Sequence, residues 1–249
     1  MADSIANAKL HPQPAKTIDT TKVQANGIAM VPDSNLVIPE QESVIENDDV
    51  AMTFTNHGGF PKKVVLKKFK TFDGKPLRLF DGVKNYLDFS FKSTNGLMVH
   101  TKTENMTSST SADGKSITYT GADCEITYTI PASGYLINMK ATPINADKSQ
   151  LVNLEWASES LLTEHDLASQ EMYTHVCYNL ESDGYDHYQI KTKETKEFKE
   201  PLKWLCFKQH YFNTTLIPDP KLVSSANVTS QIMLDTTRKS LSDFNSTLT

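Results

Sequence analysis

The sequence lacks the long apolar runs and the basic-then-apolar start that mark membrane spans and secretory signals. No apolar run approaches the roughly 18 residues that a spanning helix requires, and residues 1–4 show no signal pattern. An excess of positive charge is also missing: the 249 residues carry a net charge of −5. The chain as given is therefore predicted to be soluble and not membrane-spanning, and its charge disfavours nucleic acid and anionic lipid as partners.

Cysteine is scarce, and its spacing carries no motif. The three cysteines are Cys124, Cys177 and Cys206, so at most one disulfide can form, and no pair has the Cys-x-x-Cys spacing of metal and redox sites. Cys124 and Cys206 stand in apolar, strand-like runs, which favours buried free thiols. A disulfide would suit an oxidising compartment, and the sequence leaves that alternative open.

The histidines also lack the patterns of metal and acid–base sites. None of the seven forms His-x-His or His-Glu-x-x-His, or has a carboxylate at ligand spacing. They are His11, His57, His100, His165, His175, His187 and His210. Glycine-rich phosphate loops and nucleophile elbows are missing as well. We therefore predict no catalytic residue, no metal ligand and no cofactor.

What the sequence does contain is alternation. Val50, Met52 and Phe54 alternate with smaller or polar residues, as in a half-buried strand. Residues 56–59 supply a Gly-Gly turn, a second apolar run follows at 64–66, and a third strand begins after the Asp-Gly turn at 73–76. This pattern predicts a meander, which is a scaffold and not a catalytic loop.

Strand signals then recur about every ten residues, which is typical of a sandwich or barrel. They fall at 87–91, 124–130, 135–139, 152–156, 172–178, 198, 202–212 and 228–234. The only helical candidate is 160–170, which is too short to be stable without packing. Residues 1–42 have the composition of a linker. We predict a tether over 1–42 and an all-β domain of two large antiparallel sheets over 43–249.

Two segments invite a binding role. Lysines at 62, 63, 67, 68 and 70 interleave with apolar residues, so we expect them on the solvent side or edge of a strand, with a lipid-headgroup contact as the alternative.

In the aromatic run at 202–212, Leu205, Phe207 and Tyr211 alternate with Trp204, Cys206 and Phe212. Apolar residues on both faces favour a core strand covered on both sides, by a second sheet and a lid; a peptide-docking face is the alternative.

Long stretches of the sequence resemble the large periplasmic domain of the YidC family of bacterial membrane protein insertases. The resemblance rests on residues 46–50, 53–59, 66–77 and 79–81, and on the aromatic block at 200–212. These blocks are aromatic-rich and occur in the family's order, and the similarity extends from Val44 to about Ile217. The resemblance implies a supersandwich like that of galactose mutarotases, located in the periplasm as the soluble part of an inner-membrane protein.

The same resemblance implies a non-catalytic role in the insertion of inner-membrane proteins. Its implied partners are the SecD/SecF accessory subunits of the Sec translocon and nascent membrane proteins. Full insertases also carry a membrane anchor before this domain and a helical bundle after it. We therefore expect an excised periplasmic piece with Met1 as an added start, its tether at 1–42, and an end that stops short of the family's last strand.

A sugar-active protein, either carbohydrate-binding or aldose-epimerase-like, is the alternative. Mutarotases open a pyranose ring with a histidine and a carboxylate, and His100, His175 and Glu155 are the residues that would have to converge here. Acid–base chemistry requires those groups within hydrogen-bond reach of a bound sugar. Their spacing does not show that they meet, and a shared fold does not transfer function.

Overall fold

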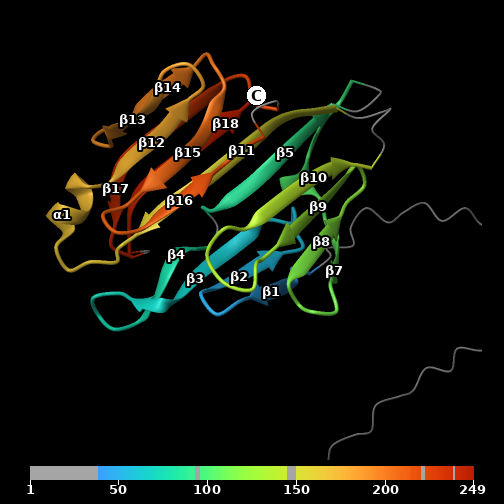
Figure 1. Ribbon diagram of the computed structural model, residues 1–249, viewed down its shortest axis with the longest axis horizontal. Helices are drawn as coiled ribbons and strands as arrows, with labels where there is room; N and C mark the ends of the chain where they lie inside the picture. The colour runs from blue at the N-terminus through green and yellow to red at the C-terminus, as the bar shows by residue number, and fades with distance from the viewer. Residues whose placement is uncertain (1–38, 83, 93–95, 145–149, 220–221, 238) are drawn as a thin grey trace, which may run out of the picture. The chain divides into compact units, whose positions relative to one another are not determined.

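The computed structural model describes residues 39–82, 84–92, 96–144, 150–219, 222–237 and 239–249. All of them belong to the unit Ile38–Thr249. Within these ranges the chain is built from eighteen strands, one 3-10 turn, η1 (Thr101–Thr103), and one short helix, α1 (Leu167–Met172) (Figure 1). Every strand pairing is antiparallel, so the prediction of an all-β antiparallel fold with one short helix is confirmed. Most of the predicted tether, residues 1–38, lies outside the described residues.

Strand pairing divides the two predicted large sheets into four. The first has the order β1-β2-β3-β4: β1 (Glu42–Glu46), β2 (Val50–Thr55), β3 (Pro61–Lys70) and β4 (Pro76–Asp81). The second has the order β10-β9-β8-β7: β10 (Asn138–Pro143), β9 (Cys124–Thr129), β8 (Ser116–Thr120) and β7 (Thr107–Thr110).

The other two sheets contain most of the C-terminal half. The six-stranded sheet has the order β14-β17-β18-β11-β5-β6: β14 (Glu194–Phe198), β17 (Ala226–Asp235), β18 (Ser240–Leu248), β11 (Gln150–Leu161), β5 (Tyr86–Lys92) and β6 (Met98–His100). The fourth has the order β13-β12-β15-β16: β13 (Gly184–Gln189), β12 (His175–Leu180), β15 (Leu202–Lys208) and β16 (Asn213–Leu216).

The β2–β3 reversal shows why the predicted Gly-Gly turn needs glycine. Gly58 and Gly59 have φ values of 85° and 63°, which side chains with a Cβ rarely adopt. A Cβ added to Gly59 would also stand 2.8 Å from the Tyr119 Cβ and 2.8 Å from the Met106 Sδ. The turn therefore presses directly against β8 and the loop before β7, and glycine is needed both for the backbone angle and for the space.

The apolar side chains form two cores. In the first, the β1–β4 sheet packs on the β7–β10 sheet, with the Phe54 and Tyr128 ring centroids 4.6 Å apart. In the second, the six-stranded sheet packs on the β13-β12-β15-β16 sheet, where Phe207 stacks on both Trp156 (4.1 Å) and Phe244 (4.3 Å). Each core buries one side of its strands, as the alternating pattern requires.

The predicted helix at 160–170 is wrong in its first part. β11 continues to Leu161, because Ser158 and Ser160 pair with β18 and point into the same layer as Trp156. The helix begins only at Leu167, after Asp166, whose side chain caps it by accepting from the Ser169 backbone N–H at 3.2 Å. Likewise, β12 begins at His175 and not at residue 172, and β10 begins at Asn138, which leaves Tyr135 in the preceding loop.

The second core gives a stability test with a matched control. Leu205 is fully buried in that core, whereas Leu222 is 66% exposed. We expect Leu205→Ala to lower the free energy of unfolding by about 2–5 kcal/mol, because it removes buried contacts and leaves a cavity. Leu222→Ala should change it by less than about 0.5 kcal/mol. Urea denaturation followed by tryptophan fluorescence measures both, and equal losses in the two variants would contradict this core assignment.

Candidate functional site

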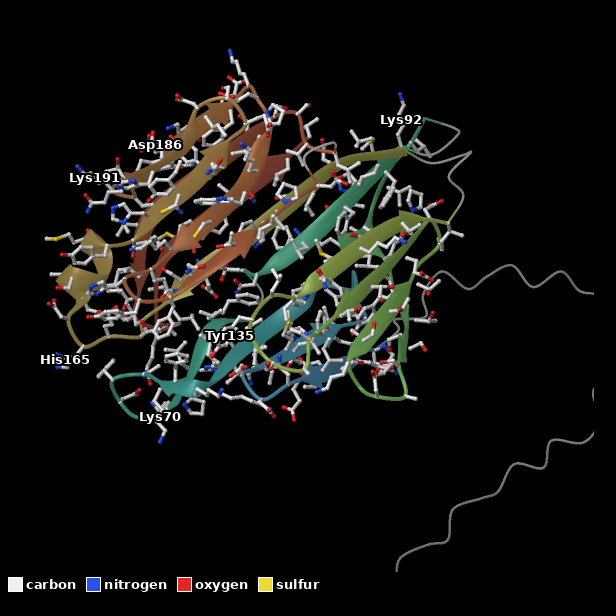
Figure 2. All side chains as sticks on the ribbon, in the orientation of Figure 1. Lys70, Lys92, Tyr135, His165, Asp186 and Lys191 are labelled. Carbon is white, nitrogen blue, oxygen red and sulfur yellow. The ribbon has the colours of Figure 1, made fainter. Side chains whose placement is uncertain are left out.

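The part of the chain that the structure describes contains a large apolar cleft of ≈ 1150 Å³. One wall is the inner face of the β1–β4 sheet, with Val50, Met52, Val64 and Leu66. The others are the loop before β10, the start of β5, the middle of β11, and the segment 211–217 that includes β16. Figure 2 labels Tyr135 on the loop that precedes β10, and this residue lines the cleft.

The cleft exposes large apolar side chains to solvent. Phe69, Tyr135, Leu136, Tyr211 and Ile217 all line it and are all exposed. A monomeric protein rarely leaves a contiguous apolar surface of this kind uncovered unless the surface binds something. The cleft is therefore the best candidate for a binding site among the described residues.

Two buried polar atoms at the cleft have no hydrogen-bond partner among the described residues: the Asn85 Nδ2 and the Tyr128 hydroxyl. The Asn85 Oδ1 is satisfied, since it accepts from the Ser158 Oγ and the Glu159 backbone N–H, each at 3.1 Å. That contact fixes the amide, so its NH₂ group is held in place without an acceptor. Buried donors of this kind are rare and call for an explanation.

Two sheet edges also contribute to the cleft. β10 pairs only with β9, and β16 pairs only with β15, among the strands that the structure describes. Both supply lining residues, Asn138 and Met139 from β10 and 213–216 from β16. An edge strand has free backbone donors and acceptors along one side, which is the usual template for an added strand.

The aromatic run at 202–212 does not alternate over its whole length as predicted. Leu205 and Phe207 lie in the second core, as expected, but β15 ends at Lys208, so Tyr211 and Phe212 leave the strand. Tyr211 is exposed in the cleft, and Phe212 packs edge-on against Phe69 at 5.4 Å.

Among the described residues, the outer face of β15 is contacted by side chains of the neighbouring strand, where a lid was predicted. Trp204 and Cys206 point to this face, and the ring of Tyr185 on β13 lies 5.8 Å from the Trp204 ring.

Of the three residues that the sugar-active alternative requires, His100 and Glu155 lie on the same sheet and His175 lies on a different one. On the six-stranded sheet, the His100 Nδ1 lies 2.8 Å from Asp88, and the Glu155 carboxylate accepts from Tyr86 at 2.6 Å and from Asn245 at 2.8 Å.

Burial raises the pKa of Glu155, but the bonds from Tyr86 and Asn245 outweigh it, so the net shift is downward and favours the carboxylate. His175 is on β12, in a different sheet, where its ring lies 5.3 Å from that of His187.

Several of the remaining predicted features have structural partners. Three of the five lysines on β3 contact acidic residues: the Lys62 Nζ lies 2.8 Å from Glu40, the Lys67 Nζ lies 3.1 Å from Glu46, and Lys68 contacts Asp49. His210 lies 2.9 Å from Glu164. His11 lies outside the described residues. Among the residues described, no group of three or more His, Cys, Asp or Glu side chains is placed to hold a metal ion.

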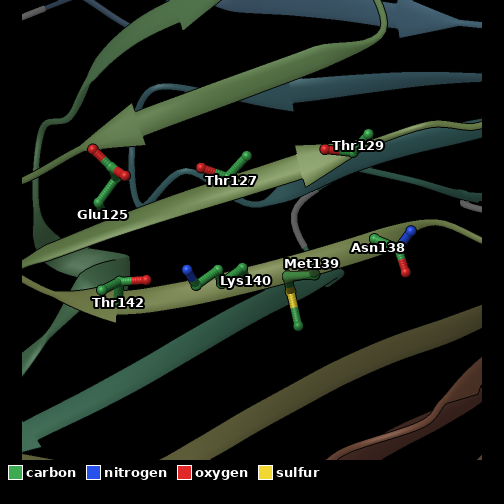
Figure 3. A pocket seen from close by; sticks show the side chains of 7 residues that line it. All are labelled: Glu125, Thr127, Thr129, Asn138, Met139, Lys140 and Thr142. Atoms are coloured by element: carbon green, nitrogen blue, oxygen red, sulfur yellow. The ribbon is translucent and has the colours of Figure 1, made fainter.

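A second, smaller hollow of ≈ 340 Å³ lies on the β9–β10 hairpin (Figure 3). Its lining is polar, with Glu125, Thr127 and Thr129 along β9 and Lys140 and Thr142 along β10. The hydroxyl of Thr127 is already bonded to that of Thr118 at 3.0 Å. The volume of this hollow is about a third of that of the cleft, so it would enclose much less of a bound molecule.

The chain is similar to several curated membrane protein insertases. It is 29% identical to the YidC insertase of Phocaeicola vulgatus over 193 residues, covering 72% of this chain and 30% of that protein. It is 24% identical to that of Porphyromonas gingivalis over 232 residues, covering 87% and 37%. The chain thus spans about a third of the length of these relatives. No helix in the described ranges is long and apolar enough to cross a membrane.

Solved structures are more distant. A galactose mutarotase-like protein from Lactobacillus casei ATCC 334 aligns with a TM-score of 0.45 and 12% identity, over 84% of this chain and 87% of that one. A putative aldose 1-epimerase from Escherichia coli K12 aligns with a TM-score of 0.42 and 9% identity, over 84% and 88%. At these values the likeness carries no argument about chemistry.

The sequence profile described as the YidC periplasmic domain matches residues 42–242. That match covers the described strands from β1 to the start of β18, and it confirms the resemblance noted from the sequence blocks. The chain therefore belongs to the family of YidC periplasmic domains.

Proposed function

We propose that this domain is a non-catalytic periplasmic part of a membrane protein insertase and that it holds extended apolar segments of client proteins in the cleft. The observation that carries the proposal is the apolar cleft lined by two sheet edges, β10 and β16. In this proposal the domain lies on the periplasmic side of the inner membrane, residues 1–42 act as a tether, and residues 43–249 form the binding domain.

The cleft fits a peptide better than a small metabolite. At ≈ 1150 Å³ it exceeds the usual 300–1,000 Å³ of small-molecule pockets and lacks their convergent charged groups. An extended segment can pair its backbone with an edge strand and place alternate side chains against the apolar wall. The unpartnered Asn85 Nδ2 supplies a donor for a backbone carbonyl of that segment.

A matched pair of leucines tests the cleft. Leu136 and Leu222 are each 66% exposed, but only Leu136 lines the cleft. We expect Leu136→Asp to weaken binding of a fluorescent apolar peptide about tenfold or more, because it puts a charge where apolar surface is buried. Leu222→Asp should leave the affinity within about twofold. Fluorescence anisotropy gives both dissociation constants, and unchanged binding in Leu136→Asp would refute the cleft as the peptide site.

Docking to the Sec translocon is the second part of the proposal, supported by family membership. We expect purified SecD/SecF to bind the full chain and a variant lacking residues 1–42 with similar affinity, since the folded domain would carry the contact surface. Surface plasmon resonance measures this. Binding that disappears with residues 1–42 would assign the contact to the tether, and no binding by either protein would remove this part of the proposal.

The sugar-active alternative has one supporting observation, the His100–Asp88 pair beside the Glu155–Tyr86 contact on the six-stranded sheet. Against it, His175 is in another sheet, and Glu155 already accepts two hydrogen bonds. We expect the protein to leave the rate of glucose anomer interconversion, followed by polarimetry, at the buffer value. An acceleration that disappears in His100→Ala would instead establish the epimerase.

A further inference from the structure

Two of the three cysteines, far apart in sequence, stand directly opposite each other. Cys177 on β12 pairs with Cys206 on β15 in the antiparallel register. Directly opposed residues in such a ladder have Cα atoms about 4.5–5.5 Å apart and side chains on the same face. That spacing is within the 4.4–6.8 Å over which disulfides close.

The pair lies on the outer face of its sheet and not in the core. Val176 and Tyr178 flank Cys177 in sequence and point into the second core, as Leu205 and Phe207 do beside Cys206. The cysteines are only 4% and 7% exposed.

A layer of side chains covers the pair. The Tyr185 hydroxyl, 4.0 Å away, donates to the Cys177 Sγ, and Tyr185 itself is 59% exposed. Because the pair lies outside the core, we expect a reagent to reach it by displacing covering side chains such as Tyr185, without opening the core.

Their surroundings make the two sulfurs unequal. The hydrogen bond from Cys206 lowers the pKa of Cys177, burial opposes this, and Tyr185, His187 and Lys208 add to the lowering. The pKa of Cys206 is raised by the same bond and by burial. A thiolate beside a protonated partner is the arrangement in which one sulfur attacks and the other resolves. Cys124 differs, since burial raises its pKa to about 12.

We propose that Cys177 and Cys206 form a cross-strand disulfide by exchange with a low-molecular-weight or protein disulfide. The Cys177 thiolate attacks one sulfur of the oxidant R–S–S–R, which forms a mixed disulfide and releases RS⁻. The released thiolate takes the proton of Cys206, whose sulfur then attacks the Cys177 Sγ and expels the second RS⁻. The second RS⁻ takes up from solvent the proton that Cys177 released when it ionised, so overall two protein thiols are oxidised to one disulfide and one oxidant is reduced to two RSH.

The Cys177–Cys206 disulfide would stabilise the wall of the cleft that includes β16. Cys206 is opposite Cys177 on one side and opposite Thr215 of β16 on the other. A disulfide therefore ties β12 to the strand on which the cleft's edge strand is built. This inference goes beyond peptide docking, and the experiment below uses no peptide or Sec component, so the two can fail separately.

The test is a thiol count and a peptide map on the full chain. The purified, reduced protein is incubated with oxidised glutathione, alkylated in denaturant and digested with trypsin without reduction. Lysines at 191, 193, 196, 199 and 203 separate the two cysteines into different peptides. We expect free thiols to fall from three to one, a cross-linked pair of peptides containing Cys177 and Cys206, and Cys124 alkylated.

Stability gives an independent readout. Oxidation should raise the melting temperature by roughly 5–10 °C, because the bond closes a loop of about thirty residues. The shift should persist in Cys124→Ser and disappear in Cys206→Ser. Three free thiols after oxidation, a stable mixed disulfide with glutathione on one cysteine, or a link that includes Cys124 would each overturn the proposal, and none of these results depends on a variant folding.

Discussion

The pairing of β5 with β11 is the constraint on which the rest of the domain depends. Leu87 of β5 belongs to the second core, while Phe89 and Phe91 of the same strand belong to the first. On β11, Trp156 is buried in the second core and Leu154 packs against both. Because one continuous strand pair supplies side chains to two cores, the two sheet packings cannot shift independently without losing contacts along that pair.

That shared pair also explains where the cleft lies. Trp156 and Leu87 line it from β11 and β5, and the two sheets that end at β10 and β16 supply further walls. Each of those two sheets already buries its apolar face in a core, so neither needs to extend across the cleft. The result is apolar surface with unpaired strand edges beside it, which is the combination that favours an extended chain as the occupant.

The serines of β18 show how a central strand can escape sequence analysis. Ser242 and Ser246 are fully buried, with Ser242 bonded to Ser160 and Ser246 to the Trp156 carbonyl oxygen. Their hydroxyls are satisfied by the neighbouring strand, so small polar residues take positions that apolar ones usually hold. The strand therefore has no apolar alternation, and nothing in its sequence predicted that it would be the neighbour of β11 and β17.

Local patterns determined the strand class, the Gly-Gly turn, the meander of β2 to β4 and the family, since alternation and turn chemistry act between near neighbours. The predicted start of the helix at residue 160 was wrong because strand pairing of Ser158 and Ser160 with β18 outweighed the local helix preference. Only the tertiary structure decided that His100 and Glu155 lie on one sheet while His175 lies on another. It also decided that Cys177 lies opposite Cys206 and that two edge strands line one cleft. These features depend on cross-strand register between distant segments, and register is set by packing across the sheets, which is not encoded within any single stretch of sequence.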